Sequence, residues 1–322
     1  MISKRFLLLN LGLAILCFTS GCASQTKILT YKDLEYSSYA TKQGKEKLLL
    51  DLFLPEQKSS QPLPVLIYIH GGGWLSGSKD LCQKNIQKRQ GIEKFIQRGY
   101  ALACINYRLS DRAIFPAQIQ DAKTVVRWLK QNANKYNLNP DKIGAWGESA
   151  GGHLSALLGT SAGVKELEGN PKNPQFSSRV QAVVNLFGPT DFTKVPPAFD
   201  QPYTPAVEKY KQRPWYHYTK VTNRLLGAPV SKNLKLANLA NPITHIDAND
   251  PPFLVAHGAL DETVPLSQSE LLVKALQAKG VEVTYIQEPK RGHYFGGDKG
   301  EYFAPKYIDM MLNFFDTHLK DK

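Results

Sequence analysis

A serine in a setting typical of a nucleophile lies near the middle of the chain. Residues 147–151 spell Gly-Glu-Ser-Ala-Gly, which places Ser149 in a Gly-x-Ser-x-Gly motif. In this motif the serine lies on a strained turn between a strand and a helix, with its hydroxyl exposed. The flanking residues are small because a bulky side chain would clash across so tight a turn. The motif predicts a serine that attacks a carbonyl carbon.

A glycine-rich loop could stabilise the charge that such an attack creates. Residues 70–74 spell His-Gly-Gly-Gly-Trp. Glycine N–H groups can approach a developing oxyanion closely, so we expect an oxyanion hole made by Gly72, Gly73 and Ala150. Gly71 is a further candidate donor. Phosphate-binding loops are also glycine-rich, but their spacing and their Lys-Ser/Thr partners are missing here.

Two side chains beside these motifs have open roles. Trp74 is expected either to line the substrate pocket or to pack as a structural aromatic. Glu148, next to the nucleophile, is expected either to support the site or to belong to a plain salt bridge.

A serine hydroxyl is unreactive until a base takes its proton. The chain has seven histidines, and the order nucleophile, acid, histidine leaves only His293 and His318 as candidates. His293 follows the last predicted strand, whereas His318 lies in the predicted terminal helix. We therefore expect His293 to be the base.

The acid that orients this histidine is expected in the loop after the preceding strand. Asp261 lies there, and its carboxylate would accept the second ring N–H of His293 and stabilise the imidazolium. Asp261 could instead only cap the helix that begins near Pro265, and Glu262 is the alternative acid. We favour Asp261 because the serine and histidine would otherwise lack an orienting partner. The three residues together predict a serine hydrolase.

The elements that must position these residues alternate along the chain. Strands are expected at 31–40, 48–54, 64–70, 100–107, 142–147, 180–187, 252–257 and 281–287, with a turn at 138–141. Helices are expected at 86–98, 116–135, 149–160, 266–279 and 302–319. This alternation predicts an α/β fold with a mostly parallel sheet covered by helices on both faces.

Residues 191–250 interrupt this alternation as an irregular, cap-like insert rich in Pro, Tyr and Lys. Long inserts in compact domains commonly form lids or binding loops. The aromatic residues of the insert are expected either to line a pocket or to fill a small core of its own. They are Phe199, Tyr203, Tyr210, Trp215, Tyr216 and Tyr218.

The first 22 residues have the pattern of an export signal. Lys4 and Arg5 precede an apolar run over 6–18, and small residues follow up to Cys22. Residues 19–22 resemble a bacterial lipobox, which would make Cys22 the lipidated first residue of an envelope lipoprotein attached to a membrane. Simple cleavage near Ala23 would instead release a periplasmic or secreted protein.

Net charge and cysteine content give further expectations about partners and about a disulfide. The net charge of +12 falls to +10 when the signal is removed with Lys4 and Arg5. The lysines are scattered, without a base-reading helix, zinc-ligand spacing or an RNA-binding signature, so we expect no nucleic-acid partner and no metal site. Cys82 and Cys104 remain after cleavage; an oxidising compartment permits a disulfide, and buried free thiols fit equally well.

The motifs together resemble those of α/β-hydrolases. Residues 50–55, 70–74, 106–109 and 147–153, with the Asp261 and His293 segments, are similar to the HGGG-carrying, hormone-sensitive-lipase-like carboxylesterases. The wider pattern is closer to acetylxylan/feruloyl esterase-like proteins, over a domain at 31–320. The resemblance implies Ser149 as nucleophile, Asp261 as acid, His293 as base and no cofactor.

The expected function is hydrolysis of short-chain acyl esters, acetylated sugars among them, through an acyl-enzyme. Two alternatives stay open. One is a small-molecule amidase, formamidase or peptidase that uses the same three residues. The other is a non-catalytic envelope binding protein on a hydrolase fold, against which the intact order of serine, aspartate and histidine speaks.

Overall fold

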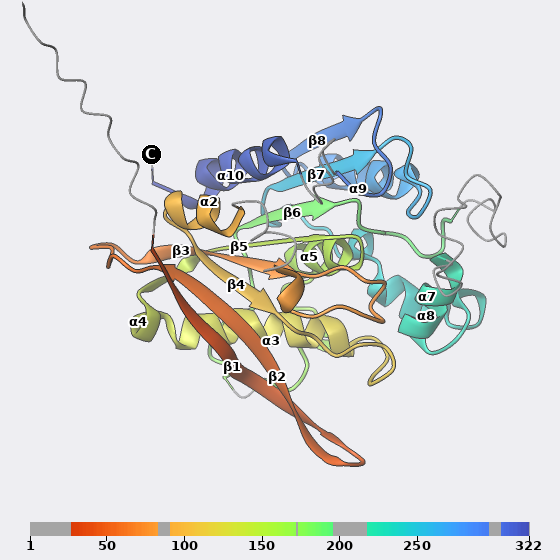
Figure 1. Cartoon of the computed structure of the whole chain (residues 1–322). Helices are drawn as coiled ribbons and strands as arrows, with labels where there is room; N and C mark the ends of the chain where they lie inside the picture. The colour runs from red at the N-terminus through yellow and green to blue at the C-terminus, as the bar shows by residue number, and fades with distance from the viewer. Residues whose placement is uncertain (1–26, 83–90, 172, 196–217, 296–303, 322) are drawn as a thin grey trace, which may run out of the picture.

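The computed structural model describes residues 27–82, 91–171, 173–195, 218–295 and 304–321 and shows one eight-stranded sheet (Figure 1). The strand order is β1-β2-β4-β3-β5-β6-β7-β8. The two pairings of β2, with β1 and with β4, are antiparallel, and the other pairings are parallel. The mostly parallel sheet predicted from the sequence is therefore confirmed. Its strands are β1 (Ile28–Thr41), β2 (Gly44–Pro55), β3 (Leu63–Ile69), β4 (Ala101–Ile105), β5 (Leu138–Glu148), β6 (Ala182–Leu186), β7 (Phe253–Gly258) and β8 (Val283–Glu288).

Helices cover both faces of the sheet, because side chains alternate between the faces along each buried strand. In β3, Ile67 belongs to one hydrophobic core and Tyr68 to the other. The first core is closed by α3, α5 and α9, and the second by α2 and α10. The helical segments are α2 (Gly91–Gln97), α3 (Ala117–Gln131), α4 (Ala133–Tyr136), α5 (Ala150–Thr160), α6 (Lys165–Glu168), α7 (Tyr218–Leu226), η4 (Val230–Lys232), α8 (Leu234–Ala240), η5 (Pro242–Thr244), α9 (Leu266–Ala278) and α10 (Pro305–Leu319).

Two local expectations in the first half of the chain were wrong. The helix predicted over 116–135 is divided at Asn132 into α3 and α4. The turn predicted at 138–141 is instead the start of β5, because Leu138 pairs with Leu63 before a register shift in the sheet. The reversal comes earlier, at Asn137, whose φ of 53° is left-handed.

The insert at 191–250 is not irregular in its second half, so that part of the prediction was wrong. From Tyr218 the chain forms α7, η4, α8 and η5. The buried residues of α7 include Tyr218, Val221, Thr222 and Leu225, which have the spacing of one helix face. A nine-residue helix without a neighbouring strand escapes a search for alternating strands and helices. The insert aromatics Phe199, Tyr203, Tyr210, Trp215 and Tyr216 lie outside the described residues.

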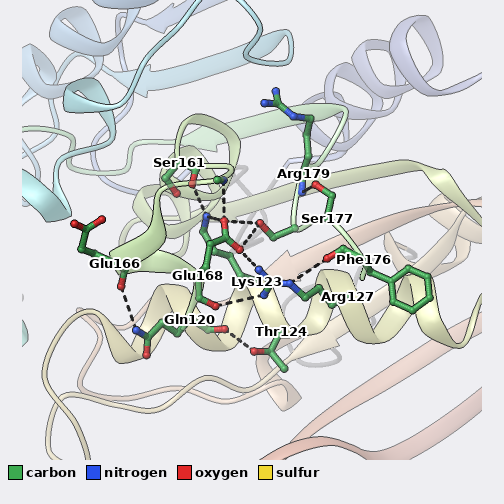
Figure 2. Close-up of polar contacts among 12 residues, drawn as sticks. Gln120, Lys123, Thr124, Arg127, Ser161, Glu166, Glu168, Phe176, Ser177 and Arg179 are labelled. Atoms are coloured by element: carbon green, nitrogen blue, oxygen red, sulfur yellow. Dashed lines mark hydrogen bonds and ion pairs between the residues drawn. The ribbon is translucent and has the colours of Figure 1, made fainter. Parts of the chain in front are cut away.

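A buried ionic cluster fixes the segment after α5 to α3 (Figure 2). The side chain of Lys123 is fully buried, and its Nζ lies 2.7 Å from Glu168 Oε1 and 2.5 Å from the carbonyl oxygen of Ser161. Arg127 pairs with the same carboxylate, and the Ser178 hydroxyl lies 3.0 Å from both of its oxygens. Since Ser161 directly follows α5, the cluster connects α3, α6 and the end of α5.

A disulfide joins Cys82 to Cys104 of β4, which decides between the two alternatives that the sequence leaves open. The predicted signal at 1–22 and the candidate lipidation site Cys22 lie outside the described residues. Within the part of the chain that the structure describes, no helix is both long enough and apolar enough to cross a bilayer.

Candidate active site

Ser149 lies at the sharp turn between β5 and α5. Its φ of 54° is left-handed, an unfavourable conformation for a residue with a side chain. Its N–H donates to the carbonyl of Leu186 in β6 at 2.9 Å, which anchors the turn to the neighbouring strand. A Cβ atom on Gly147 or Gly151 would lie 2.4 or 2.0 Å from the carbonyl oxygen of Ile69. The predicted need for small flanking residues is therefore confirmed.

Asp261 and His293 meet at the carboxyl ends of the adjacent parallel strands β7 and β8. His293 Nδ1 lies 2.8 Å from Asp261 Oδ2, and both residues are buried. The other carboxylate oxygen accepts the backbone N–H groups of Thr263 and Val264, each at 2.8 Å. Asp261 thus pairs with the predicted base and also fixes the turn before α9. Among the described residues, no side chain caps the first turn of α9, so the alternative role expected for Asp261, that of a helix cap, was wrong.

The protonation state of Asp261 follows from its surroundings. Burial by itself would raise the pKa of this carboxyl group, but the charge of His293 and the hydrogen bonds from His257 and His293 hold the pKa well below its usual range. Asp261 is therefore a carboxylate that accepts hydrogen bonds and does not donate them.

Phe187 connects the serine to the histidine. It directly follows Leu186, the residue that binds the N–H of Ser149. Its ring contacts the His293 ring edge to face, with 4.8 Å between centroids. Thr263 and Val264, from the loop of Asp261, line the same pocket as Ser149. The structure therefore brings the three predicted residues together at one edge of the sheet.

The glycine loop approaches Ser149 with left-handed backbone at Gly72 and Gly73, whose φ angles are 107° and 61°. Gly73 and Ala150 line the pocket with the serine. Ala150 begins α5, and the first N–H groups of a helix have no acceptor within the helix. Gly71 differs, because its N–H already donates a hydrogen bond within the protein, to Glu148 Oε1 at 3.2 Å.

Glu148 holds the glycine loop through a hydrogen bond to Gly71. It is buried, and the hydroxyl of Tyr68 donates to its Oε1 at 2.7 Å, beside the N–H of Gly71. Burial raises the pKa of Glu148 to about 7, since both donors are neutral and compensate only part of the lost hydration. Of the two roles expected for Glu148, these contacts favour support of the site.

The pocket beside Ser149 is small and mostly apolar. Its empty volume is about 270 Å³, including a part open to solvent, and it is lined by Gly73, Trp74, Ser149, Ala150, Pro189, Tyr218, Val221, Thr263 and Val264. Trp74 also packs edge-on against His153 and Phe192, so it lines the pocket and is structural at once. Tyr218 and Val221 come from α7, through which the insert contributes one wall. Among the described residues, no group of three or more His, Cys, Asp or Glu is placed to hold a metal ion.

A comparison with known protein families identifies the family of this chain. The family model BD-FAE matches residues 50–276, which include the second half of β2, the glycine loop, Ser149 and Asp261. The chain belongs to the BD-FAE family. Of the site residues only His293 lies beyond the matched range.

This BD-FAE family member is also similar to proteins that are named as ester hydrolases. The probable carboxylic ester hydrolase LipM of Mycobacterium tuberculosis is 31% identical over 271 residues, covering 82% of this chain and 56% of LipM. Esterase LipC of the same organism is 30% identical, covering 77% of this chain and 57% of LipC. The chain thus spans little more than half the length of these relatives.

One solved structure matches over almost its whole length. The truncated form of a carbohydrate esterase from gut microbiota has a TM-score of 0.74 and 28% identity, covering 93% of this chain and 99% of that one. An α/β-hydrolase fold is thereby confirmed for this family member.

Two contacts at the site have no counterpart in the sequence analysis. Glu148 contacts Gly71, and a second histidine, His257, contacts Asp261. His257 is visible in the sequence only as the histidine that ends a strand before the acid. Chain order excludes it as the base, and nothing in the sequence indicates that its ring turns toward Asp261.

Proposed function

We propose that the protein is a serine-dependent carboxylic ester hydrolase. The hydrogen bond between His293 and Asp261, at the edge of a pocket lined by Ser149, carries this proposal. Membership of the BD-FAE family and the names of the similar relatives support it.

In the proposed reaction, Ser149 Oγ attacks the ester carbonyl while His293 takes the hydroxyl proton. Asp261 orients the imidazole and stabilises the imidazolium. The tetrahedral oxyanion lies against the N–H groups of Ala150, Gly73 and Gly72. The C–O bond to the alcohol then breaks, and His293 gives its proton to the departing alkoxide. Water, deprotonated by His293, attacks the acyl carbon. The bond to Ser149 Oγ then breaks, His293 returns the proton to Oγ, and the acid is released.

The pocket favours a small acyl group. Trp74, Tyr218 and Val221 limit the room beside Ser149. A carbohydrate ester is a suitable substrate class, because the similar solved structure is named a carbohydrate esterase. We therefore propose acetyl or other short acyl esters of sugars as substrates.

Hydrolysis of p-nitrophenyl esters from acetate to laurate, by the wild type and by Ser149→Ala, tests the activity. The proposal expects serine-dependent cleavage that is fastest with acetate or butyrate. A maximum at laurate contradicts the short-acyl preference. Cleavage that survives in Ser149→Ala contradicts the proposed role of Ser149. No cleavage of any ester contradicts the proposed activity and favours amides or the binding-protein alternative.

We also propose that the chain is exported by its first 22 residues and attached to the cell envelope through Cys22. Fractionation of bacteria that express the full chain tests this. The wild type is expected in the membrane fraction and Cys22→Ser in soluble fractions. Equal partition of the two would contradict lipidation.

A further inference from the structure

A second histidine, His257, contacts the carboxylate of Asp261. His257 lies in β7 and is fully buried. Its Nε2 lies 3.1 Å from Asp261 Oδ2, the same oxygen to which His293 Nδ1 is bonded at 2.8 Å. The two imidazole rings therefore share one carboxylate oxygen.

The surroundings of His257 fix which ring nitrogen carries a proton. Nε2 faces two acceptors, Asp261 Oδ2 and the carbonyl oxygen of Val264, each at 3.1 Å. Both need a donor, so Nε2 is protonated. Nδ1 lies 2.7 Å from the hydroxyl of Ser269 on α9, which can donate to it. Ser269 thus holds the tautomer that points an N–H at Asp261.

With this contact, each oxygen of the Asp261 carboxylate accepts two hydrogen bonds. Oδ1 accepts the two backbone N–H groups of Thr263 and Val264, and Oδ2 accepts His257 and His293. Four acceptor sites are roughly what an ionised carboxylate offers. The N–H groups on Oδ1 come from the turn that follows Asp261, whereas the second donor on Oδ2 is a fully buried ring of β7 that is held against Ser269 of α9.

We propose that His257 is a positioning residue of the hydrolase: through Nε2 it holds the Asp261 carboxylate in the orientation that aims His293 at Ser149, with Ser269 fixing its tautomer. This inference rests on the proposed function. His257 touches neither the substrate nor the reacting atoms. Its effect passes through the Asp261–His293 bond, so its loss should lower kcat and leave the binding of the ester largely unchanged.

A matched pair of variants separates positioning from packing. In His257→Gln the side-chain amide nitrogen can take the place of Nε2 and still donate to Asp261. In His257→Asn the shorter amide reaches only the place of Nδ1, beside Ser269, and leaves Oδ2 with one donor fewer. Ser269→Ala keeps the imidazole of His257 and removes only the group that fixes its tautomer.

The kinetics of p-nitrophenyl acetate hydrolysis by the full chain test the proposal, with near-ultraviolet circular dichroism as the folding control. His257→Asn is expected to lose about 10- to 100-fold in kcat, the range for a small misplacement of reacting groups, with KM within about threefold. His257→Gln should recover most of that loss, and Ser269→Ala should lose less than His257→Asn. If His257→Asn does not fold, the comparison of His257→Gln and Ser269→Ala with the wild type decides.

Three results would overturn the inference: wild-type kcat in folded His257→Asn, a change confined to KM, or no advantage of Gln over Asn. Should the Asn variant fail to fold, wild-type kcat in Ser269→Ala would overturn it equally. Ser149→Ala, measured in the same series, separates this outcome from failure of the proposed function. If Ser149→Ala is inactive, only the role of His257 falls; if Ser149→Ala keeps its activity, the serine mechanism itself is wrong.

Discussion

The carboxylate of Glu148 accepts a hydrogen bond from the backbone N–H of Gly71, which lies 77 residues earlier in the chain. This bond connects the residue before the proposed nucleophile to the first glycine of the loop that supplies the proposed oxyanion hole. We therefore expect the side chain of Glu148 to help position Gly72 and Gly73 relative to Ser149. Because this bond occupies the N–H of Gly71, we do not expect Gly71 to donate to the substrate.

The first prediction concerns this connection. Glu148→Ala should lower kcat by about 10- to 100-fold, since loss of one oxyanion-hole donor costs about 100- to 1000-fold and here donors are displaced rather than removed. Glu148→Gln keeps an acceptor oxygen for Gly71 and should stay within about threefold of the wild type. Tyr68→Phe is the control, because it removes the other donor to Glu148 and leaves the bond to Gly71. Equal losses in Glu148→Ala and Tyr68→Phe would contradict a specific role of the Gly71 contact.

The second prediction is a pH dependence of stability. The pKa of Glu148 is about 7 in the folded protein against 4.5 in its ordinary state, so the fold favours the neutral acid. As pH rises from 4.5 to 7 the unfolded chain ionises first, and the free energy of unfolding should fall by about 3 kcal/mol before it levels off. Glu148→Gln has no such proton to lose.

Urea denaturation of the wild type and Glu148→Gln at pH 4.5, 6 and 8 measures this difference. Other titrating groups affect both proteins alike, so the comparison isolates Glu148. The wild type should lose more stability than the variant over this range. A parallel pH dependence of the two proteins would show that Glu148 is ionised in the fold as easily as in the unfolded chain.

The strands of the sheet and the order of the proposed catalytic residues along the chain could be predicted, because both are indicated by short sequence patterns. Short apolar segments bounded by turns marked the strands. The motif around Ser149, together with the order of Asp261 and His293 along the chain, indicated the candidate site. The structure confirms the strained turn at Ser149, whose φ is 54°.

What could not be predicted depends on side-chain direction and on contacts between distant segments. The bond from Gly71 to Glu148 and the disulfide between Cys82 and Cys104 join residues whose proximity is set by the sheet order. The direction of the His257 ring depends on Ser269, from the next helix. The helix α7 was missed because its buried face spans only nine residues.

The third prediction concerns the turn at the nucleophile. In Gly151→Ala the new Cβ would lie 2.0 Å from the carbonyl oxygen of Ile69, and backbone must move to relieve this contact. We expect a loss of several kcal/mol in the free energy of unfolding, roughly the upper end for single substitutions, and a loss of esterase activity in any folded fraction.

Gly163→Ala is the matched control, since Gly163 lies just after the end of α5 and has open space around its Cβ position. Because the φ of Gly163 is 86°, an alanine there has left-handed backbone, and we expect the free energy of unfolding to fall by about 1–2 kcal/mol. The kcat should stay normal. Thermal melts and kcat measured on both variants test the contrast. Similar melting temperatures and similar kcat values for the two would refute the steric argument.

The fourth prediction assigns the acid. Asp261→Asn keeps the size of the side chain but removes the charge that His293 needs, so kcat should fall about 10,000-fold with the fold intact. Glu262→Gln is the comparison, because Glu262 is adjacent in sequence and exposed. It should keep nearly normal activity. Near-normal kcat in Asp261→Asn, together with a loss in Glu262→Gln, would move the assignment to Glu262.

The last prediction concerns the ionic cluster at the end of α5 (Figure 2). Glu168 pairs with two buried basic side chains, Lys123 and Arg127. Burial lowers the pKa of Lys123 to about 7, and the carboxylate of Glu168 at 2.7 Å favours its charged form. Glu168→Gln leaves both without a counter-charge and should cost about 3–5 kcal/mol, the range for a buried charge that has lost its partner. Lys123→Met removes one cation, and the Glu168 carboxylate keeps Arg127 and Ser178.

Lys123→Met should therefore cost less than Glu168→Gln, and the order of the two is the test. Urea denaturation at one pH and one salt concentration measures both free energies of unfolding. The sites lie away from the pocket, so folded protein should keep the wild-type KM for p-nitrophenyl acetate. If Lys123→Met were as destabilising as Glu168→Gln, the packing of the lysine stem would outweigh the balance of charge in this cluster.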